Sequence, residues 1–190
     1  MTSSYALADQ LKRDPAPAPV LGSIAELWSG PGPHLIDMRT LCQALLDQVG
    51  TRAALQHVKV KLALPNSPAR VIGYATPLAT AVHQLLTNAL DAMPKNGTLI
   101  LRVLLEPYVV LECCDTGPPI PDDQIPRLWD RHQAHSTIGA LNLPKTRKVI
   151  EAHHGQIWYR RQPGGGRCFS IELPVAGPRG VVASRSASPT

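Results

Sequence analysis

Apolar residues recur at helical spacing in three segments of the chain. In Leu35–Val49 they fall three or four positions apart, and Asp37 stands near the start as a capping residue. A second helix opens at Pro77, where a missing backbone donor is tolerated, and ends before the turn signal "PKNG". A third covers roughly Leu143–His153. The pattern therefore predicts three amphipathic helices.

Other segments alternate apolar and polar residues or are almost continuously apolar, as strands are. In Val58–Leu64 the alternation places Lys59 and Lys61 on an outward face. The middle pair is apolar enough to indicate a sheet that helices cover on at least one side. "QPGGG" supplies a turn between the last two strands. The expected strands are "VKVKLAL", "ARVIGY", "TLILRVLLE", "YVVLECCD", "GQIWYRR" and "GRCFSIELP".

A long stretch without regular pattern separates the fourth strand from the third helix. It reads "DTGPPIPDDQIPRLWDRHQAHSTIGALN", and only "DDQIPRLWD" resembles a short helix. Loops of this length inside a compact domain are usually functional or mobile. The first residues, rich in Pro, Ala and Gly, predict an N-terminal arm over 1–34, and the small polar residues of 175–190 predict a disordered tail. The folded domain is expected between them, over 35–174.

Composition narrows the class of protein. Hydrophobic residues make up 44% and charged residues 17% of the chain, a balance typical of globular domains. Aromatic residues make up only 4%, so a core of Leu, Val, Ile and Ala is expected, which suits a layered α/β domain. The net charge of +5 is spread along the chain without a basic, aromatic-interleaved patch, so nucleic acid is not expected as a partner.

Sequence signals for a membrane span, for a signal peptide and for paired cysteines are weak. No apolar run is long enough to cross a bilayer, and the first residues lack the layout of a signal peptide, so we expect a cytoplasmic protein. The four cysteines, Cys42, Cys113, Cys114 and Cys168, form no CxxC pair. We expect them to be free thiols, without a disulfide or a metal.

Polar residues on the second helix are the first candidates for a site. Gln84, Asn88 and Asp91 lie three or four residues apart and share one helix face. Amide and carboxylate oxygens there suit Mg²⁺ accompanied by substrate phosphates. Asp115, at the end of a strand, suits the amino group of a purine because an ionised carboxylate only accepts hydrogen bonds. Each residue taken alone also fits a capping, solvated or turn-forming role.

The order of these motifs resembles the histidine-kinase-like ATPase domain, the Bergerat or GHKL fold, from about Leu35 to Pro174. "HQLLTNALDAM" is similar to the family's N box, "DTGPPIP" to its G1 box, and "IPRLWDRHQ" to the start of its ATP lid. "KVIEAHHGQIWYRRQPGGGRCFSIELP" resembles the family's end, which consists of a helix, a strand, a glycine turn and a final strand. The resemblance implies an α+β, two-layer sandwich in which a mixed, mostly antiparallel sheet packs against three helices.

The resemblance also implies roles for individual residues, with ATP and Mg²⁺ as cofactors. Asn88 would coordinate Mg²⁺ between the phosphates, and Asp115 would bind the adenine amino group, with Gly117 giving the base room. Asp91 would lie at the rim of the nucleotide, and Lys95 is a candidate phosphate contact or a solvated surface lysine. Gln84 takes the general-base position, where its neutral amide disfavours hydrolysis.

Several positions depart from the family pattern. Pro119 replaces the second G1 glycine, and Ala140 and Asn142 replace two glycines of the lid motif, with Gly139 as partial compensation. Arg167 stands where the family's last strand usually carries Thr. The pocket is therefore expected to be eroded.

No phosphoacceptor histidine in the family's usual setting is visible, because "HLIDMRTL" at His34 has the wrong spacing. We therefore expect neither autonomous kinase nor ATPase activity; the chain would at most be a histidine-kinase-type, ATP-dependent phosphotransferase. One hypothesis is a two-component signalling domain that binds Mg·ATP and acts with a partner, such as a phosphoacceptor domain or a response regulator. The alternative is a pseudokinase that has lost nucleotide and regulates a response regulator or sigma factor by contact. The sequence does not indicate an oligomeric state.

Overall fold

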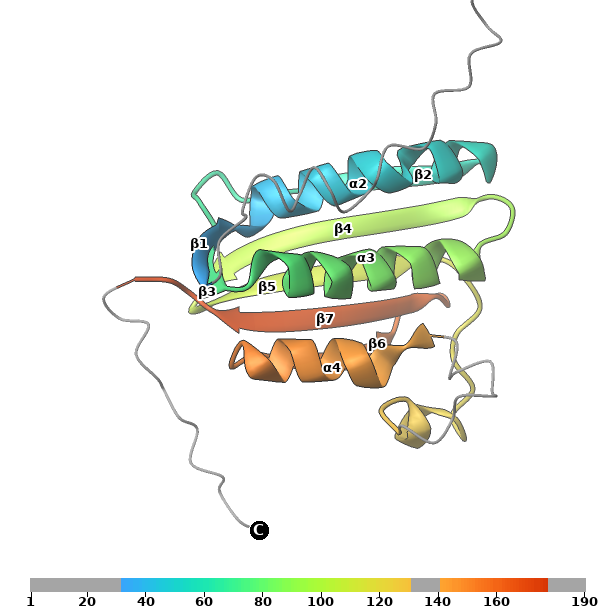
Figure 1. The fold of residues 1–190 in the computed structure, drawn as a ribbon. Coiled ribbons are helices and arrows are strands. Elements are labelled where there is room, and N and C mark those ends of the chain that lie inside the picture. Colours follow the sequence, from blue (N-terminus) through green and yellow to red (C-terminus); the bar gives the residue numbers. More distant parts are fainter. Residues whose placement is uncertain (1–31, 131–140, 178–190) are drawn as a thin grey trace, which may run out of the picture.

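The computed structural model describes residues 32–130 and 141–177. Within these ranges the chain forms two layers, in which three helices lie side by side over one face of a five-stranded sheet (Figure 1). The helices are α2 (Met38–Leu55), α3 (Ala75–Ala92) and α4 (Leu143–Ala152). The predicted fold class is confirmed.

The main sheet has the strand order β2-β4-β5-β7-β6. Only β2 and β4 run parallel, and the other neighbours are antiparallel. The turn at Gly164–Gly166 joins β6 to β7 as a tight hairpin, which only antiparallel neighbours allow. The strands are β2 (Val58–Ala63), β4 (Gly97–Glu106), β5 (Tyr108–Asp115), β6 (Gln156–Arg161) and β7 (Arg167–Pro174).

A second, two-stranded sheet was not predicted. β1 (His34–Asp37) pairs with β3 (Arg70–Gly73) in antiparallel register. The expected first helix therefore begins at Met38 instead of Leu35, and it continues to Leu55. Asp37 caps it as predicted, since its side chain accepts a hydrogen bond of 3.0 Å from the Arg39 backbone N–H. The short helical candidate in the long loop is a single turn, η2 (Ile125–Arg127).

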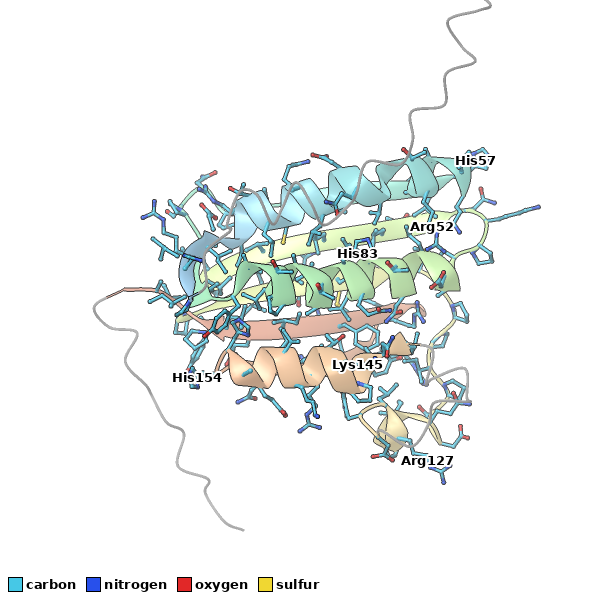
Figure 2. The ribbon with its side chains drawn as sticks, in the orientation of Figure 1. Arg52, His57, His83, Arg127, Lys145 and His154 are labelled. Atoms are coloured by element: carbon cyan, nitrogen blue, oxygen red, sulfur yellow. A yellow bond between two sulfur atoms is a disulfide. The ribbon has the colours of Figure 1, made fainter. Side chains whose placement is uncertain are left out.

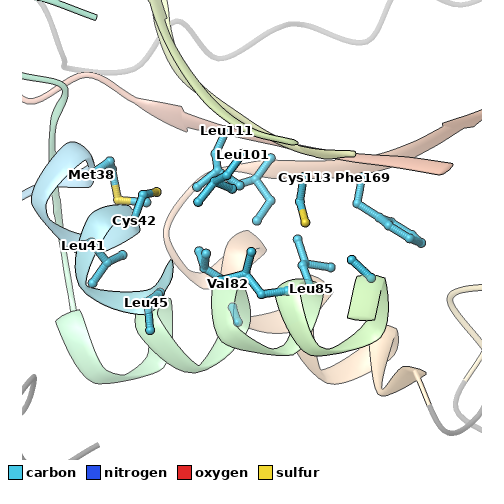
Figure 3. Close-up of a cluster of buried hydrophobic side chains, with 14 of the residues drawn as sticks. Met38, Leu41, Cys42, Leu45, Val82, Leu85, Leu101, Leu111, Cys113 and Phe169 are labelled. Atoms are coloured by element: carbon cyan, nitrogen blue, oxygen red, sulfur yellow. The ribbon is translucent and has the colours of Figure 1, made fainter. Parts of the chain in front are cut away.

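The core lies between the helices and the inner face of the sheet (Figure 3). Leu45 of α2 and Val82 and Leu85 of α3 face Leu101 and Phe169 of the sheet. Alternation along β5 sends Cys113 into this core and Cys114 to the opposite face. Helix α3 is thereby covered by neighbours on both sides and beneath, which explains its ten buried residues.

The expectation of four free cysteines is wrong for one pair. Cys114 and Cys168 are disulfide-bonded, although they lie 54 residues apart in sequence. They are direct register partners on β5 and β7, which brings their Cα atoms to 4.0 Å. Cys42 and Cys113 are free, and burial raises the pKa of both thiols. Register between distant strands is what brings the bonded pair together.

No helix of the described ranges combines the length and the apolar character needed to cross a membrane.

Candidate functional site beside the central helix

Asp115 is the centre of the candidate site. It is the last residue of β5, and only 3% of its surface is exposed. Its Oδ1 accepts a hydrogen bond of 2.8 Å from the backbone N–H of Gly117. A Cβ at Gly117 would stand 2.8 Å from both Oδ1 of Asp115 and Cβ of Ala92. The turn after β5 therefore requires glycine at this point.

Arg167 is the main partner of Asp115. Its Nε lies 3.1 Å from each carboxylate oxygen, and its Nη2 donates a hydrogen bond of 2.8 Å to the backbone carbonyl of Asn88. Arg167 is 6% exposed, so the whole ion pair is buried between the sheet and α3. Charged hydrogen bonds of this kind are stronger than those between neutral groups. The guanidinium thus ties β5, β7 and α3 together.

The chain folds this way because Arg167 and Asp115 are direct partners in the β5–β7 register. Gly166, just before Arg167, has φ +95°, and a Cβ there would stand 2.3 Å from the carbonyl oxygen of Asp115. Glycine therefore allows the β6–β7 turn to end tightly against β5. From this position the arginine side chain reaches across to α3.

The ionisation of Asp115 reflects two opposing effects. Burial raises the pKa of its carboxyl group, because a low-polarity environment disfavours the charged form. The guanidinium of Arg167 and the N–H of Gly117 oppose that rise by stabilising the carboxylate. Without Arg167, Asp115 would be a buried carboxyl group that lacks its counter-charge.

Asn88 also has partners within the protein. It is 2% exposed, its Oδ1 accepts a hydrogen bond of 2.9 Å from Nε2 of Gln84, and its Nδ2 donates one of 2.8 Å to the carbonyl of Leu141. The Leu141 contact joins α3 to the segment before α4. The amide oxygen that the resemblance assigns to Mg²⁺ is therefore engaged by another side chain.

Two predicted residues lie apart from this cluster. Asp91 forms an ion pair with Arg52 of α2, and both side chains are about half exposed. Arg52 lies on the last turns of α2, beside the end of α3 (Figure 2). Lys95 is exposed in the turn between α3 and β4. Gly139, the remaining predicted residue, lies outside the described residues.

The structure thus brings together Gln84, Asn88, Asp115 and Gly117, and it adds Arg167 and the Leu141 carbonyl. The sequence signal for Arg167 was its place at the family's Thr position. Its pairing with Asp115 was not predicted, because that contact depends on strand register. The nucleotide-binding roles of these residues stay predictions.

ATP and Mg²⁺, which the resemblance implies, would have to compete with hydrogen bonds that these side chains already make within the chain. The carboxylate for the adenine amino group has both oxygens on Arg167, and the Asn88 oxygen accepts from Gln84. Within residues 32–130 and 141–177, no three His, Cys, Asp or Glu side chains are grouped to hold a metal ion.

Comparisons with known proteins agree with the fold. The sequence profile of the family described as "Histidine kinase-, DNA gyrase B-, and HSP90-like ATPase" matches residues 73–177. The adaptive-response sensory kinase SasA of Gloeothece citriformis is 30% identical over 146 residues, which are 73% of this chain and 37% of that protein. SasA of Thermosynechococcus vestitus is 30% identical over 148 residues, 74% of this chain and 39% of that protein. The chain thus spans about two fifths of these relatives.

Solved structures show the same architecture. The nucleotide-free catalytic domain of histidine kinase ThkA has a TM-score of 0.70 and 23% identity, and the match covers 75% of this chain and 95% of that domain. The mycobacterial sensor histidine kinase MprB has a TM-score of 0.66 and 24% identity, with 75% of this chain and 97% of that one covered. At these identities the likeness supports the fold alone.

Proposed function

Because the chain belongs to the histidine kinase-, DNA gyrase B- and HSP90-like ATPase family, we propose that it serves two-component signalling through contact with a protein partner, without turning over ATP. In this proposal the domain keeps the kinase fold as a binding module. The partner is a response regulator or a phosphoacceptor domain.

One observation carries the proposal: the polar groups that the resemblance assigns to nucleotide are bonded to one another. Asp115 is held by Arg167, and the side chain of Asn88 by Gln84 and Leu141. Gln84 also stands at the general-base position, where an amide cannot accept the proton of an attacking water. In this proposal hydrolysis lacks its general base, and the Asn88 oxygen is shared with Gln84.

The partner side of the proposal is supported by the relatives. They are named sensory kinases, and this chain covers only part of their length. A shared catalytic-domain fold is compatible with action on another protein.

A second candidate function is Mg·ATP binding with partner-assisted phosphotransfer. It is favoured by the retained Asn88, Asp115 and Gly117, which occupy the order and spacing of the family's boxes. For this function, Arg167 would have to leave Asp115, and Gln84 would have to leave Asn88. The two functions therefore differ in whether those bonds open.

The experiment combines turnover with binding of defined partners. The purified chain is incubated with radiolabelled Mg·ATP, and it is titrated by fluorescence anisotropy against a panel of receiver and phosphoacceptor domains. We expect no phosphate release and no labelling of the chain. At least one panel member should bind saturably, and ATP should not change its affinity.

Steady ATP hydrolysis, or labelling that disappears in Asn88→Ala, would contradict the proposal and favour the second candidate. Failure of every panel member to bind would remove the proposed class of partner.

A further inference from the structure

Arg167 bonds both oxygens of the Asp115 carboxylate, to which the resemblance assigns the adenine amino group. We infer that this side chain is a built-in occupant of the base subsite, and that it closes that subsite to adenine nucleosides. The inference rests on the proposed function and deepens it, since it names the residue that excludes the ligand.

Arg167 is a stronger hydrogen-bond donor to Asp115 than adenine would be. Adenine binds a carboxylate through a neutral amino group, whereas Arg167 brings Nε to 3.1 Å from both oxygens of Asp115 and adds a positive charge. A neutral donor cannot replace a charged hydrogen bond at equal strength. Adenine would also have to displace the bond of 2.8 Å between Nη2 and the Asn88 carbonyl. Exchange of the side chain for the base is therefore unfavourable.

Burial makes the occupation stable. Asp115 and Arg167 are 3% and 6% exposed, so solvent can replace little of the bonding between them. A guanidinium expelled from this position would leave the carboxylate buried without its counter-charge. The pair consequently holds itself in place as part of the packing of α3 against β5 and β7.

Two other departures from the family belong to its lid motif. Ala140 and Asn142 replace glycines of the lid motif, which the resemblance assigns to the phosphates. Adenosine has the base but no phosphate, so its binding tests the base subsite without any effect of the replaced lid glycines on phosphate binding. It is therefore the probe that isolates the effect of Arg167.

A matched control is available on the neighbouring strand. Arg161 of β6 is the register partner of Arg167. It bonds Oδ1 of Asp122 at 2.7 Å, and its side chain is 44% exposed. The same substitution at Arg161 removes an arginine from the same end of the sheet but leaves Asp115 paired.

The test is a calorimetric titration of adenosine into the natural chain, Arg167→Thr and Arg161→Thr. We expect saturable binding only by Arg167→Thr. Its Kd should be at least about tenfold below the weakest Kd that the titration can detect, and the other two chains should show no binding. Addition of Asp115→Asn to Arg167→Thr should abolish the binding. An Arg167→Thr chain that unfolds as cooperatively as Arg161→Thr but binds no adenosine would overturn the inference.

A second measurement uses the natural chain and so does not depend on the variant folding. The Nε–H of Arg167, assigned by its loss in Arg167→Lys, should exchange slowly with solvent in NMR spectra and stay unchanged with millimolar adenosine. Displacement of that signal by adenosine would overturn the inference. The proposed function fails separately, through ATP turnover by the natural chain, whatever Arg167→Thr binds.

Discussion

At the scale of single residues, Asp37 links a sequence signal to an electrostatic effect. The Asp37 side chain accepts a hydrogen bond from the backbone N–H of Arg39 at the start of α2. Its Oδ2 accepts another, of 2.8 Å, from Nη2 of Arg39. These hydrogen bonds lower the pKa of the Asp37 carboxyl group. The folded state therefore favours its charged form.

Asp37→Ala should lower the free energy of unfolding by about 1 kcal/mol at pH 7, the usual cost of losing a helix cap. Since the pKa is lower in the folded state, the contribution of Asp37 is present above about pH 4 and is lost as the pH falls through the folded value. Urea unfolding at pH 7 and pH 3 measures this. Asp47→Ala, which removes an exposed carboxylate further along α2, is the control. If Asp37→Ala lowered the free energy of unfolding equally at pH 7 and pH 3, the predicted contribution of the carboxylate charge would be contradicted.

Gly73 is fixed by a different cause, the close approach of His153. A Cβ at Gly73 would stand 2.3 Å from Cδ2 of that ring. The ring cannot move away freely, because Nε2 accepts from Tyr74 N–H at 2.9 Å and Nδ1–H donates to the Val149 carbonyl at 2.7 Å.

Gly73→Ala should therefore destabilise the fold by about 1–3 kcal/mol, as overpacking does. Gly50→Ala is the matched control, since it lies inside α2 with nothing within 4 Å of the added atom. It should stabilise the fold by up to about 1 kcal/mol through helix propensity. Thermal unfolding of the two variants measures both effects. If Gly50→Ala destabilised the fold as much as Gly73→Ala, the packing argument would be contradicted.

At the scale of elements, the helices and most strands were predictable because each carries a local period. The end of α3 before "PKNG" and the cap at Asp37 follow from residue types that disfavour or begin helices. β1 was not predicted, since four residues leading into a helix carry no period of their own. The Cys114–Cys168 bond and the Asp115–Arg167 pair were missed for a shared reason: both depend on the β5–β7 register.

The disulfide joins β5 to β7 across 54 residues of sequence. Its removal in a Cys114→Ala, Cys168→Ala variant should lower the free energy of unfolding by about 2–4 kcal/mol, because the unfolded chain gains freedom. Urea unfolding of the oxidised natural chain and of the variant measures the difference. If the intact mass of the oxidised chain does not change on reduction, the bond does not form in solution and the prediction fails.

At the scale of the whole molecule, the fold and the chemistry of the site diverge. The order of the family's boxes was enough to predict the two-layer sandwich, because several motifs in order specify it. The candidate site was predictable only in part: Gln84, Asn88, Asp115 and Gly117 do lie together, but two further hydrogen-bond partners, Leu141 and Arg167, are distant in sequence. These partners, Arg167 above all, decide what the site can bind.

The central claim is that the side chains of this domain close their own nucleotide site. Calorimetric titration of the natural chain with Mg·ATP tests it most directly. The account predicts no saturable heat at millimolar Mg·ATP. Saturable binding that Asp115→Asn removes would contradict the account.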